Sequence, residues 1–204
     1  MSVAPLHALV YQSRATRPLE ASDLDILLLD ARMDNVRLRI QIDFGVGDVM
    51  VPGPRLIEYP AVLEGDTIQL LAYPIESAIA EKLQAMVSLG DANSRMKDFY
   101  DVWICSKHLD FDPDILLAAI VATFKNRSTP IPAEEFEALS VQFAAAHRVQ
   151  WNVFVRKIGE AELTDALSKA IEDINLFIMP ILRAIAEEQR LPHRWVAGHG
   201  WIAR

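Results

Sequence analysis

The stretch VRLRIQIDF, residues 36–44, alternates apolar and polar side chains at every position. This period of two is typical of a β-strand with one buried face. Working outward, DLDILLL (residues 23–29) is a second strand candidate, and DARMDN (residues 30–35) between the two is rich in turn-forming residues. HALVY, residues 7–11, is a candidate for a further short strand. The polar face of the 36–44 strand carries Arg37, Arg39, Gln41 and Asp43.

The spacing of apolar residues changes after residue 73. PIESAIAEKLQAMVSL, residues 74–89, places apolar side chains three or four positions apart, which predicts an amphipathic helix. Pro74 suits the first turn of that helix and Gly90 ends it. Its apolar stripe consists of Ile75, Ile79, Leu83, Met86 and Val87.

Further helices are expected along the rest of the chain. One covers about residues 94–107, and another begins at Asp112-Pro113, a cap followed by a first-turn proline, and runs to about Lys125. From Pro132 to about Arg190 the sequence reads as helical, with a kink or an end at Pro180. We therefore predict an α+β fold. A small mixed β-sheet core with helices would occupy residues 1–110, and a helical domain residues 111–204.

Composition limits the class of protein. The 204 residues are 51% hydrophobic, which is ample for a core and excludes a disordered chain. A net charge of −8 argues against a dedicated polyanion binder, although a local basic patch is compatible with it. The single cysteine, Cys105, excludes a disulfide framework and is typical of a reducing cytoplasm; we expect it to be buried and inert. We expect no membrane span and at most surface roles for the five histidines.

Three carboxylates are the first candidate site. Asp23 and Asp25 lie two apart on a predicted strand, so they share a face, and Asp43 lies on the next strand. A hairpin with a five-residue loop would pair residues whose numbers sum to 66, placing Asp23 opposite Asp43 and Asp25 opposite Gln41. The negative charges of three such carboxylates repel one another, and a divalent cation would relieve this repulsion. The alternative is that Asp23 caps a turn and Asp43 ends a strand near solvent.

The sequence LVYQSRATRPLEASDLDILLL, residues 9–29, resembles the core signature of the DNA polymerase β-like nucleotidyltransferases. That signature runs from a strand through Gly-Ser and a loop to Asp-x-Asp on the next strand. The resemblance implies that Ser13 contacts the nucleotide phosphates and that Asp23, Asp25 and Asp43 hold two Mg²⁺ ions, which clamp a phosphoryl transfer. Gln12 stands where the signature has glycine.

A longer resemblance runs from about Arg37 to the Trp-containing tail. RIQIDFGVGD (residues 39–48), YPIESAIAEKLQAMVSLGDANSRMKDFYDVW (residues 73–103) and ATFKNRSTPIP (residues 122–132) resemble the AbiEii/AbiGii-type nucleotidyltransferase toxins. The resemblance implies that Asp43 is catalytic and that Lys82 lies near the nucleotide. It also implies that Asp98 completes the site and that Lys97 meets phosphate. Arg95 lies three positions before Asp98, and Lys97 four before Asp101, which are ordinary pairs on a helix surface. For Arg95 and Asp101 we favour this structural role.

The resemblance also implies an activity. It would be transfer of a nucleoside monophosphate from an NTP to an acceptor, such as a tRNA 3′ end, in a toxin–antitoxin or abortive-infection system with a cognate antitoxin. Relative to the family the front of the chain is short, with 12 residues before Ser13 and 17 between Asp25 and Asp43. Two alternatives follow: a compact active enzyme, or an inactive remnant that interacts with a partner antitoxin. A purely structural helical module is a third.

Overall fold

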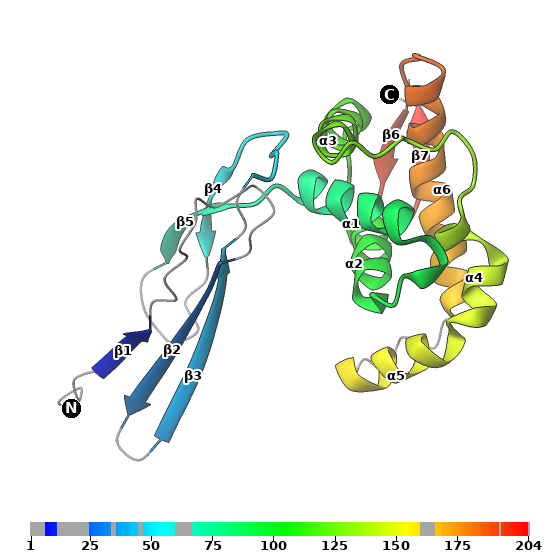
Figure 1. The fold of residues 1–204 in the computed structure, drawn as a ribbon. Coiled ribbons are helices and arrows are strands. Elements are labelled where there is room, and N and C mark those ends of the chain that lie inside the picture. The colour runs from blue at the N-terminus through cyan, green and yellow to red at the C-terminus, as the bar shows by residue number, and fades with distance from the viewer. Residues whose placement is uncertain are drawn as a thin grey trace. The chain divides into compact units, whose positions relative to one another are not determined.

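The computed structural model describes residues 7–11, 25–33, 36–44, 47–59, 67–159, 166–191 and 193–203. Residue contacts divide the chain into two compact units, residues 1–48 and 49–204. We call them the sheet unit and the helical unit (Figure 1). Together their strands and helices confirm the predicted α+β class.

The sheet unit contains an antiparallel sheet of three strands in the order β1-β2-β3. The strand predicted at residues 36–44 is confirmed with the same bounds, as β3 (Val36–Phe44). The turn predicted at residues 30–35 is shorter than expected, because β2 (Asp25–Met33) continues to Met33. On the apolar side of β3, Val36 and Leu38 are exposed rather than buried. The first strand, β1, is His7–Tyr11.

The helical unit begins with a hairpin that the sequence analysis did not identify. Its strands are β4 (Arg55–Tyr59) and β5 (Ile68–Ala72), and every residue of β4 is exposed. Leu56 pairs with Leu71 across the hairpin, and each is more than 60% exposed. The hairpin therefore places apolar side chains in solvent.

Helices follow, with bounds close to the predicted ones in the first half of the unit. Asp112 caps α3 (Pro113–Asn126), accepting hydrogen bonds from the backbone N–H groups of Asp114 and Ile115, as predicted. The long run predicted from Pro132 to Arg190 is broken into separate helices, while Pro180 lies inside the last of them without ending it. The helices are α1 (Ile75–Leu89), α2 (Met96–His108), α3 (Pro113–Asn126), α4 (Val141–Ala146), α5 (Arg148–Ile158) and α6 (Leu167–Ala186).

The end of the chain forms a second hairpin, β6 (His193–Val196) with β7 (Gly200–Ala203), where no strand was predicted. Trp195 on β6 is buried and its indole N–H donates to the Ser106 carbonyl. The ring of Trp195 also lies 4.8 Å, centroid to centroid, from that of Phe177. The tail is therefore fastened to the helical core by aromatic packing.

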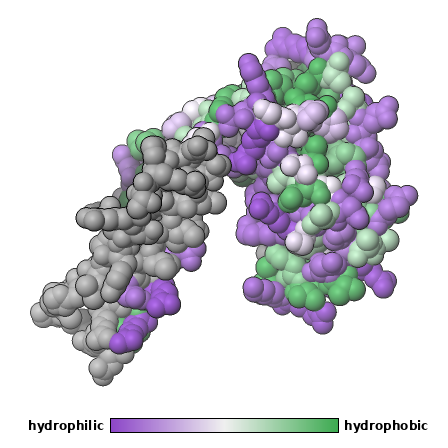
Figure 2. Space-filling model, in the orientation of Figure 1, coloured by the Kyte–Doolittle hydropathy of each residue, from purple (hydrophilic) through white to green (hydrophobic). Residues whose placement is uncertain are grey.

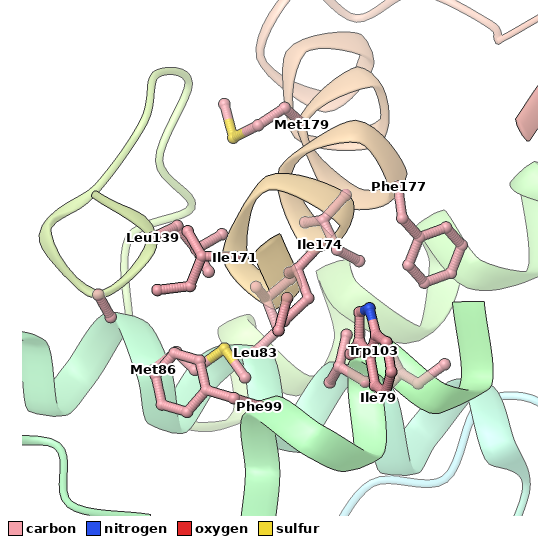
Figure 3. Close-up of a cluster of buried hydrophobic side chains, with 14 of the residues drawn as sticks. Ile79, Leu83, Met86, Phe99, Trp103, Leu139, Ile171, Ile174, Phe177 and Met179 are labelled. Atoms are coloured by element: carbon pink, nitrogen blue, oxygen red, sulfur yellow. The ribbon is translucent and has the colours of Figure 1, made fainter. Parts of the chain in front are cut away.

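The hydrophobic core joins α1, α2 and α6 (Figure 3). Leu83, Phe99 and Ile174 are fully buried, one from each helix. Because α6 packs on α2 and α3 packs on α1, the core connects residues on both sides of position 110.

The expectation that histidines have only surface roles is wrong for His147, which is buried and stacked on Phe143.

Among the described residues, none of the helices is long and apolar enough to cross a membrane. Cys105, expected to be buried, is partly buried and packs against the hydrophobic core. Partial burial, together with the nearby Asp101 carboxylate, raises the pKa of the Cys105 thiol. A raised pKa keeps the thiol protonated and unreactive at neutral pH, as expected for an inert cysteine.

Candidate functional site

Two lysines and two aspartates meet where α1 lies against α2. The Lys82 ammonium on α1 donates to Asp98 Oδ1 at 2.9 Å and lies 2.7 Å from Asp101 Oδ2. Lys97 Nζ lies 2.6 Å from the same Asp101 oxygen, in the pair one helical turn apart that the sequence predicted. We call Lys82, Lys97, Asp98 and Asp101 the Lys82 cluster.

The turn between the helices sets this geometry. Gly90 ends α1 with φ of +51°, a conformation that L side chains rarely adopt, and its N–H donates to the Met86 carbonyl. The chain then forms a 3₁₀ turn over Gly90–Ala92 before α2 begins. Asn93, fully buried, accepts a hydrogen bond from the Arg95 N–H at the start of α2. These contacts bring the first turns of α2 beside the middle of α1.

The electrostatics of the cluster favour the charged forms. Burial opposes the charge on Lys82, but hydrogen bonds to Asp101 and Asp98 outweigh that cost and raise the pKa of the ammonium. Burial likewise opposes the charge on Asp101, yet hydrogen bonds from Lys82 and Lys97 lower the pKa of its carboxyl group. Lys82 is therefore a cation at neutral pH, held in one place by two carboxylates.

Two residues of the cluster, Lys82 and Asp98, line a surface groove of about 380 Å³, which we call the Lys82 groove. Opposite charges line it, with Lys82, Arg95 and Arg127 as cations and Glu81 and Asp98 as anions. Tyr73 donates its hydroxyl hydrogen bond to Glu81 at one edge. A lysine has three N–H donors, and the described carboxylates engage two of those on Lys82. The groove can therefore present a fixed ammonium donor and guanidinium groups to an anion.

The structure brings together some predicted site residues and leaves others apart. Lys82, Lys97 and Asp98 meet in the helical unit. Asp101, for which the sequence favoured only a surface pair, bridges both lysines, and Arg95 lies in the groove wall. Ser13 and Asp23 lie outside the described residues, while Asp25 and Asp43 belong to β2 and β3 of the sheet unit.

The predicted register of the carboxylate hairpin is wrong. β2 and β3 pair residues whose numbers sum to 69, not 66, so Asp25 lies opposite Phe44 and Ile26 opposite Asp43. The shift of three is odd, and an odd shift changes which backbone positions share a face. Positions 25 and 43 consequently lie on opposite faces of the sheet, and Gln41 pairs with Leu28 rather than Asp25.

This register bears on the metal expected from the sequence. Carboxylate oxygens are the right donors for Mg²⁺. The β2–β3 pairing, however, does not put positions 25 and 43 on the same face, so a shared ion does not fit this register. Within the described ranges, no group of three or more His, Cys, Asp or Glu side chains is placed to hold a metal ion.

Arg127 is the groove residue that the sequence analysis did not single out. It lies immediately after α3, 45 positions from Lys82, and reaches the groove because α3 packs on α1. The signal available in the sequence was the segment 122–132, whose arginine follows an amphipathic helix.

The chain combines an antiparallel sheet unit with a helical unit, and the helical unit holds a lysine cation in a groove lined by charged residues. These features are compatible with the nucleotidyltransferase class. A family model described as nucleotidyl transferase AbiEii toxin, type IV toxin–antitoxin system, matches residues 9–174. The chain therefore belongs to the AbiEii nucleotidyltransferase toxin family. No curated protein and no solved structure matches the chain significantly.

Proposed function

We propose that the chain transfers a nucleoside monophosphate from an NTP to an acceptor hydroxyl. The acceptor oxygen would attack the α-phosphorus and lose its proton to water. The bond from that phosphorus to the bridging oxygen would break, and pyrophosphate would leave with the electron pair. The observation that supports this most is the Lys82 groove, where a protonated lysine is fixed beside two arginines. Family membership supports the reaction class and the NTP substrate.

In this proposal the residues of the groove bind and orient the triphosphate. Lys82 contacts the phosphates with its remaining donor, and Asp98 and Asp101 hold the ammonium in position. Lys97 contributes to the positive edge of the same cluster. Fixed cations of this kind stabilise charge that develops on the leaving phosphate, because they need no reorganisation during the reaction.

Ser13, Asp23, Asp25 and Asp43 enter the proposal through the family resemblance. Ser13 would contact phosphate, and the resemblance assigns the three aspartates to Mg²⁺, which when bound would offset the charge of the triphosphate. In the β2–β3 register, however, positions 25 and 43 lie on opposite faces and would not share one ion. An RNA such as a tRNA 3′ end is the proposed acceptor, and a cognate antitoxin is the partner that a toxin–antitoxin family implies. Because NTPs are cytoplasmic metabolites, we expect the protein to act in the cytoplasm.

An assay with α-labelled NTPs and a pool of RNA tests the activity. We expect the wild type to label RNA, and Lys82→Gln to lower the rate by about 100-fold or more, the usual loss for one fixed charge at such a site. Asp43→Ala is expected to abolish labelling, while Lys125→Gln, an exposed control on α3, keeps it. The proposal fails if the wild type transfers no label, or if Asp43→Ala and the wild type transfer it equally.

A second candidate function is a catalytically inactive relative that acts through contact with an antitoxin. The β2–β3 register favours it, because positions 25 and 43 lie on opposite faces of the sheet. NTP binding separates the two candidates, since the inactive form needs no nucleotide.

A further inference from the structure

A second groove, of about 610 Å³, opens beside the Lys82 groove between the start of α2 and α5. Arg95 and Asp98 line both grooves, so the two adjoin one another at these residues. We call the second one the α5 groove. Its wall from α2 includes Lys97, and its wall from α5 includes Val153, Phe154 and Lys157.

The α5 groove is locally basic in an acidic chain. Arg95, Lys97 and Lys157 line it against the single carboxylate of Asp98, whereas the chain as a whole carries −8. Helix α5, which contributes Lys157, contains no acidic residue. These cations are exposed, so the groove offers a polyanion several contacts in water.

The wall between these charges is apolar. Val149 and Val153, one turn apart on α5, are 67% and 55% exposed. Figure 2 shows this hydrophobic surface at the α5 end of the helical unit, flanked by hydrophilic residues. Beside them the half-buried Phe154 ring is held by two others, 5.8 Å from Trp151 and 5.7 Å from Tyr100, centroid to centroid. A fixed aromatic ring flanked by apolar side chains is a surface on which unstacked bases can pack.

We propose that the α5 groove binds the single-stranded end of the acceptor RNA. Arg95, Lys97 and Lys157 contact its phosphates, and its terminal bases pack against Phe154 and Val153. Because the groove adjoins the Lys82 groove at Arg95 and Asp98, a strand lying in it would have its end beside the bound NTP. The assignment to an acceptor strand rests on the proposed function. The choice of RNA over an acidic protein segment follows from this proximity.

Two neighbours on α5 provide a matched test. Lys157 lines the groove, whereas the Arg156 guanidinium bonds to the Asn152 carbonyl and is not part of the groove. We would measure the affinity of a short fluorescent single-stranded RNA for the full chain by anisotropy at several salt concentrations. Lys157→Glu is expected to weaken binding about tenfold or more, and Arg156→Glu much less. Removing one lysine–phosphate interaction should also reduce the slope of the logarithm of the affinity against the logarithm of the salt concentration by about 0.7.

A second pair of variants tests the apolar wall without changing a cation. Val153→Asp is expected to weaken RNA binding, and Val141→Asp, at an exposed position on α4 outside the groove, to leave it unchanged. Both side chains are more than half exposed, so neither change disturbs the core.

The outcomes separate this inference from the proposed function. Equal weakening by Lys157→Glu and Arg156→Glu, or no RNA binding by the wild type, overturns the assignment of the groove. Tight binding of an acidic peptide at Lys157 without RNA binding also overturns it. The melting-temperature shift with Mg²⁺ and NTP is measured on the same variants. If the wild type shows no such shift while RNA binding still depends on Lys157, the groove stands and the proposed transfer reaction fails.

Discussion

Asp101 shows how one side chain acquires its role from packing. Its carboxylate accepts contacts from Lys97 on its own helix and from Lys82 on the neighbouring one. The sequence revealed only the first pair, because a separation of four positions is visible along one helix. The second pair spans 19 positions and exists only because α1 packs on α2. Lys82 and Asp98 were identified from the family motif. Arg127 was missed because its place in the groove, like the pairing of Lys82 with Asp101, depends on the packing of one helix on another.

The lowered pKa of Asp101 predicts a pH dependence of stability. A carboxyl whose pKa falls on folding, from an ordinary value of 3.8, stabilises the native state above that value. This contribution disappears as the pH falls through the lower, folded pKa. Asp101→Asn should therefore be less stable than the wild type above about pH 5, and the difference should shrink as the pH falls below about 4.

Chemical unfolding at a series of pH values measures this difference. Asp91→Asn, in the exposed turn between α1 and α2, is the control and should follow the wild type throughout. A difference between Asp101→Asn and the wild type that stays constant down to the acid limit would contradict the proposed ion pairing.

At the scale of elements, periodicity predicted α1 and β3 well because each has a single apolar face. The register of β2 with β3 could not be predicted, since residues 26–29 of β2 are four consecutive apolar residues. With no alternation in β2, a register of either parity places apolar residues opposite one another. The actual register follows from β2 extending to Met33, which leaves two residues before β3.

The junction of α1 and α2 carries a prediction of its own. Gly90 has φ of +51°, and a Cβ there would meet Glu137 Oε2 at 2.7 Å, the end of a side chain that can move. The strain therefore comes mainly from the backbone, and Gly90→Ala should lower the free energy of unfolding by about 1–3 kcal/mol. At Gly53 a Cβ would meet nothing within 4 Å, so Gly53→Ala should be close to neutral. Equal stability of the two variants in urea would contradict this interpretation of the junction.

At the scale of the whole molecule, the sequence located the change from strands to helices but not the packing units. The core joins α1 and α2 to α3 and α6 across residue 110, whereas contacts divide the chain after residue 48. Sequence patterns indicate which segments form strands and which form helices. They do not show which helices share a core. The tail hairpin was missed for a similar reason, because Trp195 and Trp201 gain their packing from Phe177, a residue of the distant α6.

The central claim is that an NTP binds in the Lys82 groove, and a melting-temperature titration with Mg²⁺ and NTP tests it most directly. Ligand binding to the native state stabilises it by about 2.7 kcal/mol at 100 times Kd. The account predicts that the wild type and Lys125→Gln melt at higher temperature as NTP is added. It also predicts that Lys82→Gln needs at least about tenfold more NTP for the same rise, which corresponds to about 1.4 kcal/mol of binding energy. A wild type whose melting temperature does not change when NTP is added would contradict the account. So would a Lys82→Gln variant whose melting temperature rises at the same NTP concentrations as that of the wild type.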